Sequence, residues 1–161
     1  MSLIDQLIFL RSAARQHPSG DEAAEAISLV LLGNPYDQLF FSELSDPEWL
    51  SALVSAGCFV HLPIPIRHDD GSISYRSSLP LIGLARLAPR APAEVTRIIS
   101  TLPETDNLNI GDQIMRVMAE IQDPQQVPAL LPVAQHLAGN KSRSTRLFLR
   151  DLLKKWMLMN C

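Results

Sequence analysis

The chain has 161 residues, of which 47% are hydrophobic and 19% are charged. This length suits a single domain with its own core, and the composition argues against intrinsic disorder. Its two cysteines, Cys58 and Cys161, lie far apart, which excludes a disulfide framework and a four-ligand zinc site. We therefore expect a globular protein of a reducing compartment.

Signals for export or for membrane insertion are missing from the sequence. The N-terminal residues have no basic region before their apolar positions, and no small-residue cleavage pattern follows them. The apolar runs are much shorter than the roughly 20 residues of a membrane-spanning helix. We expect a cytoplasmic location and no membrane partner.

The charge is unevenly distributed, although the net charge is only −3. Residues 141–155 hold six basic residues and one acidic residue, a net charge of +5, so the remainder carries −8. An acidic body does not act as a general binder of polyanions. Any binding of phosphate groups is therefore predicted to involve the C-terminal segment.

Apolar spacing and helix-breaking residues predict several helices in the first part of the chain. Residues 3–16 form an amphipathic pattern that ends before Pro18, and Ser19 with Glu22 reads as a capping box for a second helix. A further start signal at residues 45–48 opens a helix that ends at Gly57. The predicted apolar face of the second helix consists of Ala23, Ile27, Val30 and Leu31.

The segment that follows has a different pattern. Pro63 and Pro65 exclude a helix, and the dipeptide Asp70-Gly71 separates two short runs that could pair as strands. We predict one long loop or a small β-hairpin at the surface, near residues 58–78. Helical spacing resumes after Leu79, and the pair Asp106-Asn107 is predicted to cap a later helix.

An internal repeat is the most informative feature of the second half. Apolar positions of one helix recur 33 residues later, those of the next recur 32 residues later, and Pro92 recurs as Pro124. A two-helix unit at this spacing is typical of an α-solenoid, whereas the alternative is an ordinary helical bundle whose patterns coincide by chance. The matched positions are Leu81/Ile114, Leu84/Val117, Ala85/Met118, Ala88/Ile121, Val95/Val127, Ile98/Leu130, Ile99/Leu131 and Leu102/Ala134.

The predicted fold class is all-α, a short α-α superhelix of antiparallel helix pairs in one domain, residues 1–161. Pro128 and Pro132 should bend or delay the helix that contains them. Apolar residues at the C-terminal end predict that a partner, a second copy of the chain or a continuing chain covers it. The predicted pairs are 2–33, 36–57, 79–103 and 109–138, with a terminal helix at 142–158 that buries Phe148, Leu149, Leu152, Leu153 and Trp156.

Several segments resemble part of large, mostly uncharacterised bacterial proteins. The resemblance covers roughly residues 38–138 and is carried by Phe40–Leu50, Ala56–Phe59, Leu84–Pro89, Ala91–Val95 and Leu102–Asn107. It implies HEAT-like or armadillo-like helical repeats, with structural motifs and no active site. It also implies that the chain could be the N-terminal region of a larger multidomain protein.

Few residues suggest catalysis or metal binding. His61 and the run His68-Asp69-Asp70 could supply metal ligands, and Cys58 lies three residues before His61. A solvated hairpin tip and an inert buried thiol explain the same residues without a ligand. Phosphate-binding glycine motifs do not occur in the sequence. We predict no catalytic residues, no metal site and no cofactor.

The sequence thus favours a non-enzymatic protein-interaction or scaffolding module. One alternative is a nucleic-acid-binding repeat that uses the C-terminal basic helix, and a second is a hydrolase or metalloenzyme that uses residues 58–70. The predicted partner contacts lie on the hairpin and on one face of the last helix: Arg67, His68, Tyr75, Arg143, Arg146, Arg150 and Lys154.

Overall fold

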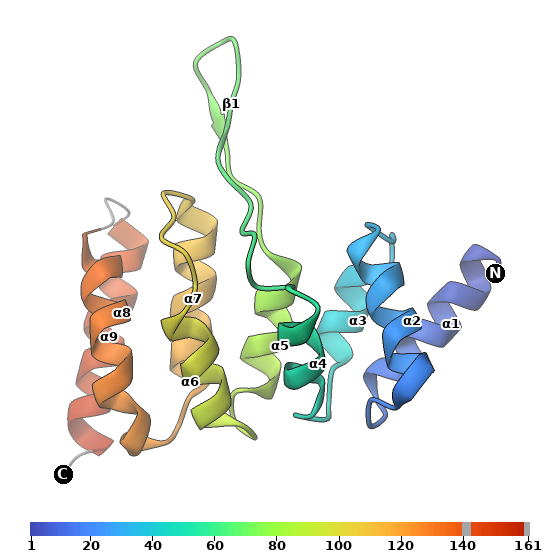
Figure 1. Cartoon of the computed structure of the whole chain (residues 1–161). Coiled ribbons are helices and arrows are strands. Elements are labelled where there is room, and N and C mark those ends of the chain that lie inside the picture. The colour runs from blue at the N-terminus through green and yellow to red at the C-terminus, as the bar shows by residue number, and fades with distance from the viewer. Residues whose placement is uncertain (140–142, 160–161) are drawn as a thin grey trace.

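The computed structural model describes residues 1–139 and 143–159, except for the side chain of Ser144. Nine α-helices stand side by side within the described residues, from the N-terminus at one end of the molecule to the C-terminus at the other (Figure 1). The all-α class is therefore confirmed. The helices are α1 (Leu3–Ala14), α2 (Gly20–Leu31), α3 (Asp37–Glu43), α4 (Trp49–Ser55), α5 (Leu79–Leu87), α6 (Pro92–Ser100), α7 (Leu108–Glu120), α8 (Val127–Ala138) and α9 (Arg143–Met159).

The helices pack in two rows. In the first row α1 contacts α3, α3 contacts α5, α5 contacts α7 and α7 contacts α9. In the second row α4 contacts α6 and α6 contacts α8, while α2 packs on α1. A short 3-10 helix, Pro124–Gln126, precedes α8, so regular α-helix begins beside Pro128 as predicted.

An aromatic core joins α3 to α4. The ring of Phe40 meets the rings of Phe41 and Trp49 edge to face, with centroids 5.3 and 5.2 Å apart. The indole N–H of Trp49 donates to the carbonyl of Gln16, and Ser45 donates its backbone N–H to Ala14. These bonds fix the α3–α4 segment against the end of α1.

Of the helix caps predicted from the sequence, one is present in the structure and one is not. Asn107 caps α7 as predicted, because its side chain accepts from the backbone N–H groups of Asn109 and Ile110. The capping box expected at Ser19 is wrong: Gly20 enters α2 with a φ of +37°, and the Ser19 side chain makes no cap hydrogen bond. A capping box is present instead between Ser2 and Asp5.

Some apolar residues expected in the core lie at the surface. Leu31 is exposed because an open groove separates the ends of α2 and α4. Leu131 is also exposed, so it departs from its repeat counterpart Ile99, which is buried. Most of the other matched positions are buried, as one face of each helix packs on its neighbours.

The terminal helix α9 buries a narrower face than the sequence indicated. Leu149, Leu152 and Trp156 are buried, as predicted. Phe148 and Leu153 were expected in the core but are 39% and 40% exposed, because α9 packs mainly on α7 and α8. The exposed side of α9 therefore combines apolar and basic side chains. Lys141, Ser142 and Cys161 lie outside the described residues.

Candidate functional site

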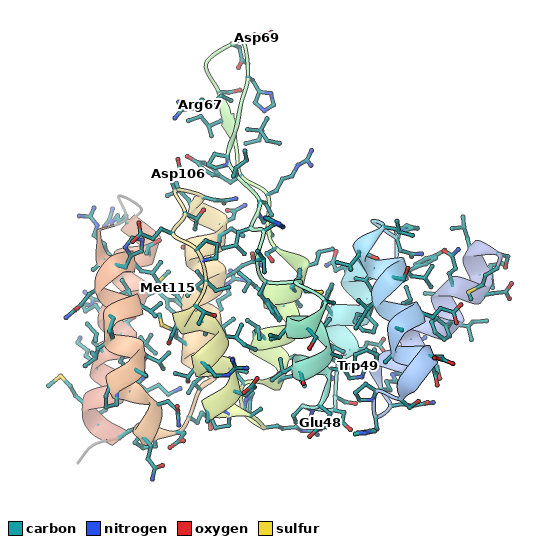
Figure 2. The ribbon with its side chains drawn as sticks, viewed as in Figure 1. Glu48, Trp49, Arg67, Asp69, Asp106 and Met115 are labelled. Carbon is teal, nitrogen blue, oxygen red and sulfur yellow. The ribbon has the colours of Figure 1, made fainter. Side chains whose placement is uncertain are left out.

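A two-stranded hairpin projects from the helical body between α4 and α5, and residues 60–76 are called the arm below (Figure 1). Strands β1 (Ile66–Arg67) and β2 (Ile73–Ser74) pair antiparallel, with Ile66 opposite Ser74 and Arg67 opposite Ile73. Of the two alternatives predicted for this segment, a long loop or a small β-hairpin, the structure has the hairpin. Figure 2 shows Arg67 and Asp69 on the outer part of the arm, well beyond the helical body.

The turn of the arm is formed by local hydrogen bonds. Gly71 has a φ of +82°, the left-handed conformation that favours glycine in such turns. The carboxylate of Asp70 accepts from the backbone N–H and the hydroxyl of Ser72, and these bonds lower its pKa. The imidazole of His68 lies 2.6 Å from the hydroxyl of Ser74.

The base of the arm is held by polar side chains of α7. Asn107 is 1% exposed and donates its amide N–H groups to the carbonyls of Pro63 and Arg76, at 2.8 and 2.9 Å. Asn109 donates to the carbonyl of Tyr75 at 2.8 Å. Two neighbouring side chains thus bind the chain before β1 and the chain after β2 to the helical body, and each bond contributes on the order of 1 kcal/mol.

A second contact orients the chain where the arm ends. Gln113 of α7 accepts from the backbone N–H of Ser78 at 2.7 Å and donates to the carbonyl of the same residue at 2.8 Å. Ser78 is buried immediately before α5. These bonds therefore fix the direction in which the arm leaves the helical body.

A pocket of about 250 Å³ lies beside the base of the arm. It contains Asp37, whose side chain the sequence analysis did not single out. Burial raises the pKa of Asp37 to about 6, and the backbone of Asn34 opposes this shift more weakly. The pocket is lined by Val30, Leu31, Asp37, Phe41, Cys58, His61, Pro63, Ser77, Ser78, Leu79 and Pro80.

The candidate metal ligands separate into two places. His61 and Cys58 line the pocket, whereas His68, Asp69 and Asp70 lie at the far end of the arm. Among the described residues, no three His, Cys, Asp or Glu side chains form a group that could hold a metal ion. Burial raises the pKa of the Cys58 thiol, so the thiol is not activated as a nucleophile. The hydrolase or metalloenzyme alternative stays a prediction.

The predicted contact residues of α9 are exposed on a different element from the arm. Arg143, Arg146, Arg150 and Lys154 are all exposed, and Arg150 forms an ion pair with Asp151 at 3.3 Å. The helix α7 lies between α5 and α9 in the first row, so the arm and this basic surface are separate. The residues singled out from the sequence therefore lie on two different elements, the arm and α9.

Sequence reasoning missed the residues that position the arm and line the pocket. Asn107 was recognised as a helix cap, but its donor groups and the roles of Asn109 and Gln113 were not recognised. Asp37 gave a usable signal, since it is the acidic residue of the segment Tyr36–Phe41, whose other residues, apart from Gln38, are apolar or aromatic. A charged residue inside such a run is a candidate for burial at a site.

Comparison of the chain with protein-family models, with curated proteins and with solved structures gives no match. Within the part of the chain that the structure describes, no helix combines the length and the apolar character needed to cross a membrane.

Proposed function

We propose that the chain is a non-enzymatic protein-interaction module of HEAT-like or armadillo-like helix pairs, and that the arm contacts the partner. The two rows of helices, in which each helix contacts the next of its row, support a short α-α superhelix. Such a stack offers an extended surface for binding protein segments.

The arm is the observation that carries this proposal. Its Ile64 side chain is 76% exposed and its Ile73 side chain is 39% exposed, although both are apolar. A projecting hairpin with a two-residue strand pairing gains little from its own contacts. The hydrogen bonds from Asn107 and Asn109 nevertheless hold it in place. Because the arm is already held in place, it loses little backbone conformational entropy when its exposed apolar and basic side chains bind a partner.

Site-specific photocrosslinking tests the proposal. A photoreactive amino acid at Ile73, in cells of the source organism, should give a crosslinked protein partner. The matched control carries the same group at Arg97, which is exposed on α6. We expect the Ile73 product to disappear when Ile64 is changed to Ser. Equal products from both positions, or none from Ile73, would contradict the proposal.

A second candidate function is nucleic-acid binding by α9, favoured by the exposure of Arg143, Arg146, Arg150 and Lys154 along this helix. Binding of a DNA duplex, followed by fluorescence anisotropy, should weaken steeply as the salt concentration rises. The variant with Glu at positions 143, 146 and 150 should lose this binding. Binding that ignores salt, or that survives in this variant, would refute the alternative.

A further inference from the structure

The pocket beside the arm combines apolar walls with one buried acid. Residues from four segments meet there: the end of α2, the start of α3, the chain after α4, and the chain entering α5. Most of its wall is formed by aliphatic side chains, prolines and the ring of Phe41. Its volume of about 250 Å³ is smaller than a typical site for a drug-sized ligand. It suits one extended side chain or a small molecule of that size.

Asp37 is the polar group that lacks a counterpart in this pocket. The residue is 7% exposed, and its Oδ1 atom is buried without a hydrogen-bond partner among the described residues. The buried Oε2 atom of Glu43, on the same helix, also accepts no hydrogen bond of regular geometry, but the guanidinium groups of Arg11 and Arg15 form ion pairs with its carboxylate. Burying a carboxylate oxygen without a donor is costly. An unpartnered acceptor that lines a cavity therefore indicates a ligand that brings the donor.

We propose that this pocket binds a primary alkylammonium group, with Oδ1 of Asp37 accepting a hydrogen bond from the ammonium. An ammonium supplies both the missing donor and the missing positive charge. The methylene stem attached to it would pack against the apolar wall, as the stems of lysine side chains do on protein surfaces.

The geometry distinguishes this ligand from other cations. A guanidinium binds both oxygens of a carboxylate with two parallel hydrogen bonds, whereas Oδ1 is the Asp37 oxygen that is both buried and without a partner among the described residues. An ammonium is a compact donor that a single oxygen can accept. A divalent ion requires several oxygen or nitrogen ligands, and no group of three suitable side chains occurs among the described residues. A primary amine therefore fits the pocket best.

The alkylammonium could come from a lysine side chain of a protein or from a free small amine. If it comes from a lysine, the inference rests on the proposed function and adds the side chain that the partner inserts beside the arm. If it comes from a free amine, the pocket is a small-molecule site that does not depend on that function. Two probes, n-butylammonium chloride and Nα-acetyl-lysine amide, separate these sources.

Titration followed by NMR of the ¹⁵N-labelled protein tests the proposal. We expect n-butylammonium to shift the backbone amides of Cys58, His61 and Leu79, with sodium chloride at the same concentration as the control for ionic strength. The neutral isostere n-butanol should bind at least tenfold more weakly. The Asp37→Asn variant keeps the shape of the side chain and should lower the affinity for n-butylammonium at least tenfold. Thermal unfolding of this variant checks that it is folded.

The pH dependence supplies an independent readout. Because the pKa of Asp37 is about 6, the affinity for n-butylammonium should fall as the pH is lowered from 7.5 to 5. The other titratable side chains that line the pocket are Cys58 and His61, and the raised pKa of the Cys58 thiol keeps it neutral over this range. The His61→Gln variant is the control and should keep the same pH dependence.

The outcomes are distinct. Binding of both probes supports the lysine source, and binding of n-butylammonium alone supports a free amine. Equal binding of n-butanol, or unchanged affinity in the Asp37→Asn variant, would overturn the proposal. The absence of any shift with either amine would also overturn it, since the buried oxygen would then be satisfied by water alone. Because these probes involve no protein partner, failure here leaves the crosslinking test of the arm unaffected.

Discussion

Two polar side chains lie beside the base of the same arm and are buried to nearly the same extent, yet their surroundings differ. Asn107 uses its oxygen to cap α7 and its nitrogen to bind the two chain segments at the base of the arm. Asp37 leaves an oxygen without a donor in a pocket. A buried polar group with all its partners inside the chain stabilises the fold, whereas one without a partner is available to something outside it.

Replacement of Asn107 should give the largest effect. The Asn107→Ala variant loses the cap of α7 and two hydrogen bonds to the arm, which should lower the free energy of unfolding by about 2 to 3 kcal/mol. Urea denaturation measures this change.

The Asn107→Asp variant separates the two roles of this residue. A carboxylate keeps the acceptor for the N–H groups of α7 but cannot donate to the carbonyls of Pro63 and Arg76. We expect α7 to persist while amide hydrogen exchange in the arm accelerates. Slow exchange in the arm of this variant would show that the donor bonds are dispensable.

Replacement of Asp37 should raise the free energy of unfolding, whereas replacement of Asn107 by Ala lowers it. Its pKa is about 6 in the folded protein and 3.8 in the unfolded chain, so the folded state holds the proton more tightly between these values. The contribution of Asp37 to stability is therefore lost as the pH rises through this window. After allowance for screening by solvent in the open pocket, Asp37→Asn should raise the free energy of unfolding by about 1 to 2 kcal/mol at pH 7.5. Near pH 4 the two proteins should be equally stable; a stabilisation independent of pH would contradict this account.

Replacement of Asn109 shows how much of the free energy of unfolding comes from a hydrogen bond at the base of the arm alone. The Asn109→Ala variant loses the bond to the carbonyl of Tyr75 but leaves the cap of α7 in place. Its free energy of unfolding should fall by about 1 kcal/mol, less than in the Asn107→Ala variant. A loss as large as that of Asn107→Ala would assign the stabilisation to the arm contacts and not to the cap.

The turn of the arm should give the smallest effect on stability. Asp70→Ala removes the bonds to Ser72, which are fully exposed. We expect the midpoint of thermal unfolding to stay unchanged, while the nuclear Overhauser contacts between Ile66 and Ser74 weaken. In the unchanged protein the same contacts should weaken as the pH falls below 3.8, because the lowered pKa of Asp70 makes its ionised form the one that holds the turn. Contacts that persist in the variant would show that Gly71 alone sets the turn.

The sequence predicted those features that depend on neighbouring residues along the chain. The dipeptide Asp70-Gly71 indicated the hairpin, and Asn107 indicated a helix start, because both signals are local. The exposure of Phe148 and Leu153 was not predictable in this way, since an apolar face is buried only where another helix covers it.

The site itself depended on contacts between distant segments. Asn107 binds carbonyls 44 and 31 residues earlier in the chain. Asp37 is placed in a pocket whose other residues come from segments extending to Pro80. A pattern over neighbouring residues can mark Asp37 as a candidate for burial, but it does not show which distant segments meet around it. The sequence therefore indicated the arm but not what holds it or what lies beside it.

The row in which α1, α3, α5, α7 and α9 each contact the next has a consequence for the order of local unfolding. A helix inside the row is held from two sides, whereas α1 and α9 have one neighbour in that row. Local opening should therefore begin at the two ends and reach α5 last, as in structures whose units couple only to their neighbours. The arm is attached directly before α5, so it is rooted in the part of the molecule that opens least often.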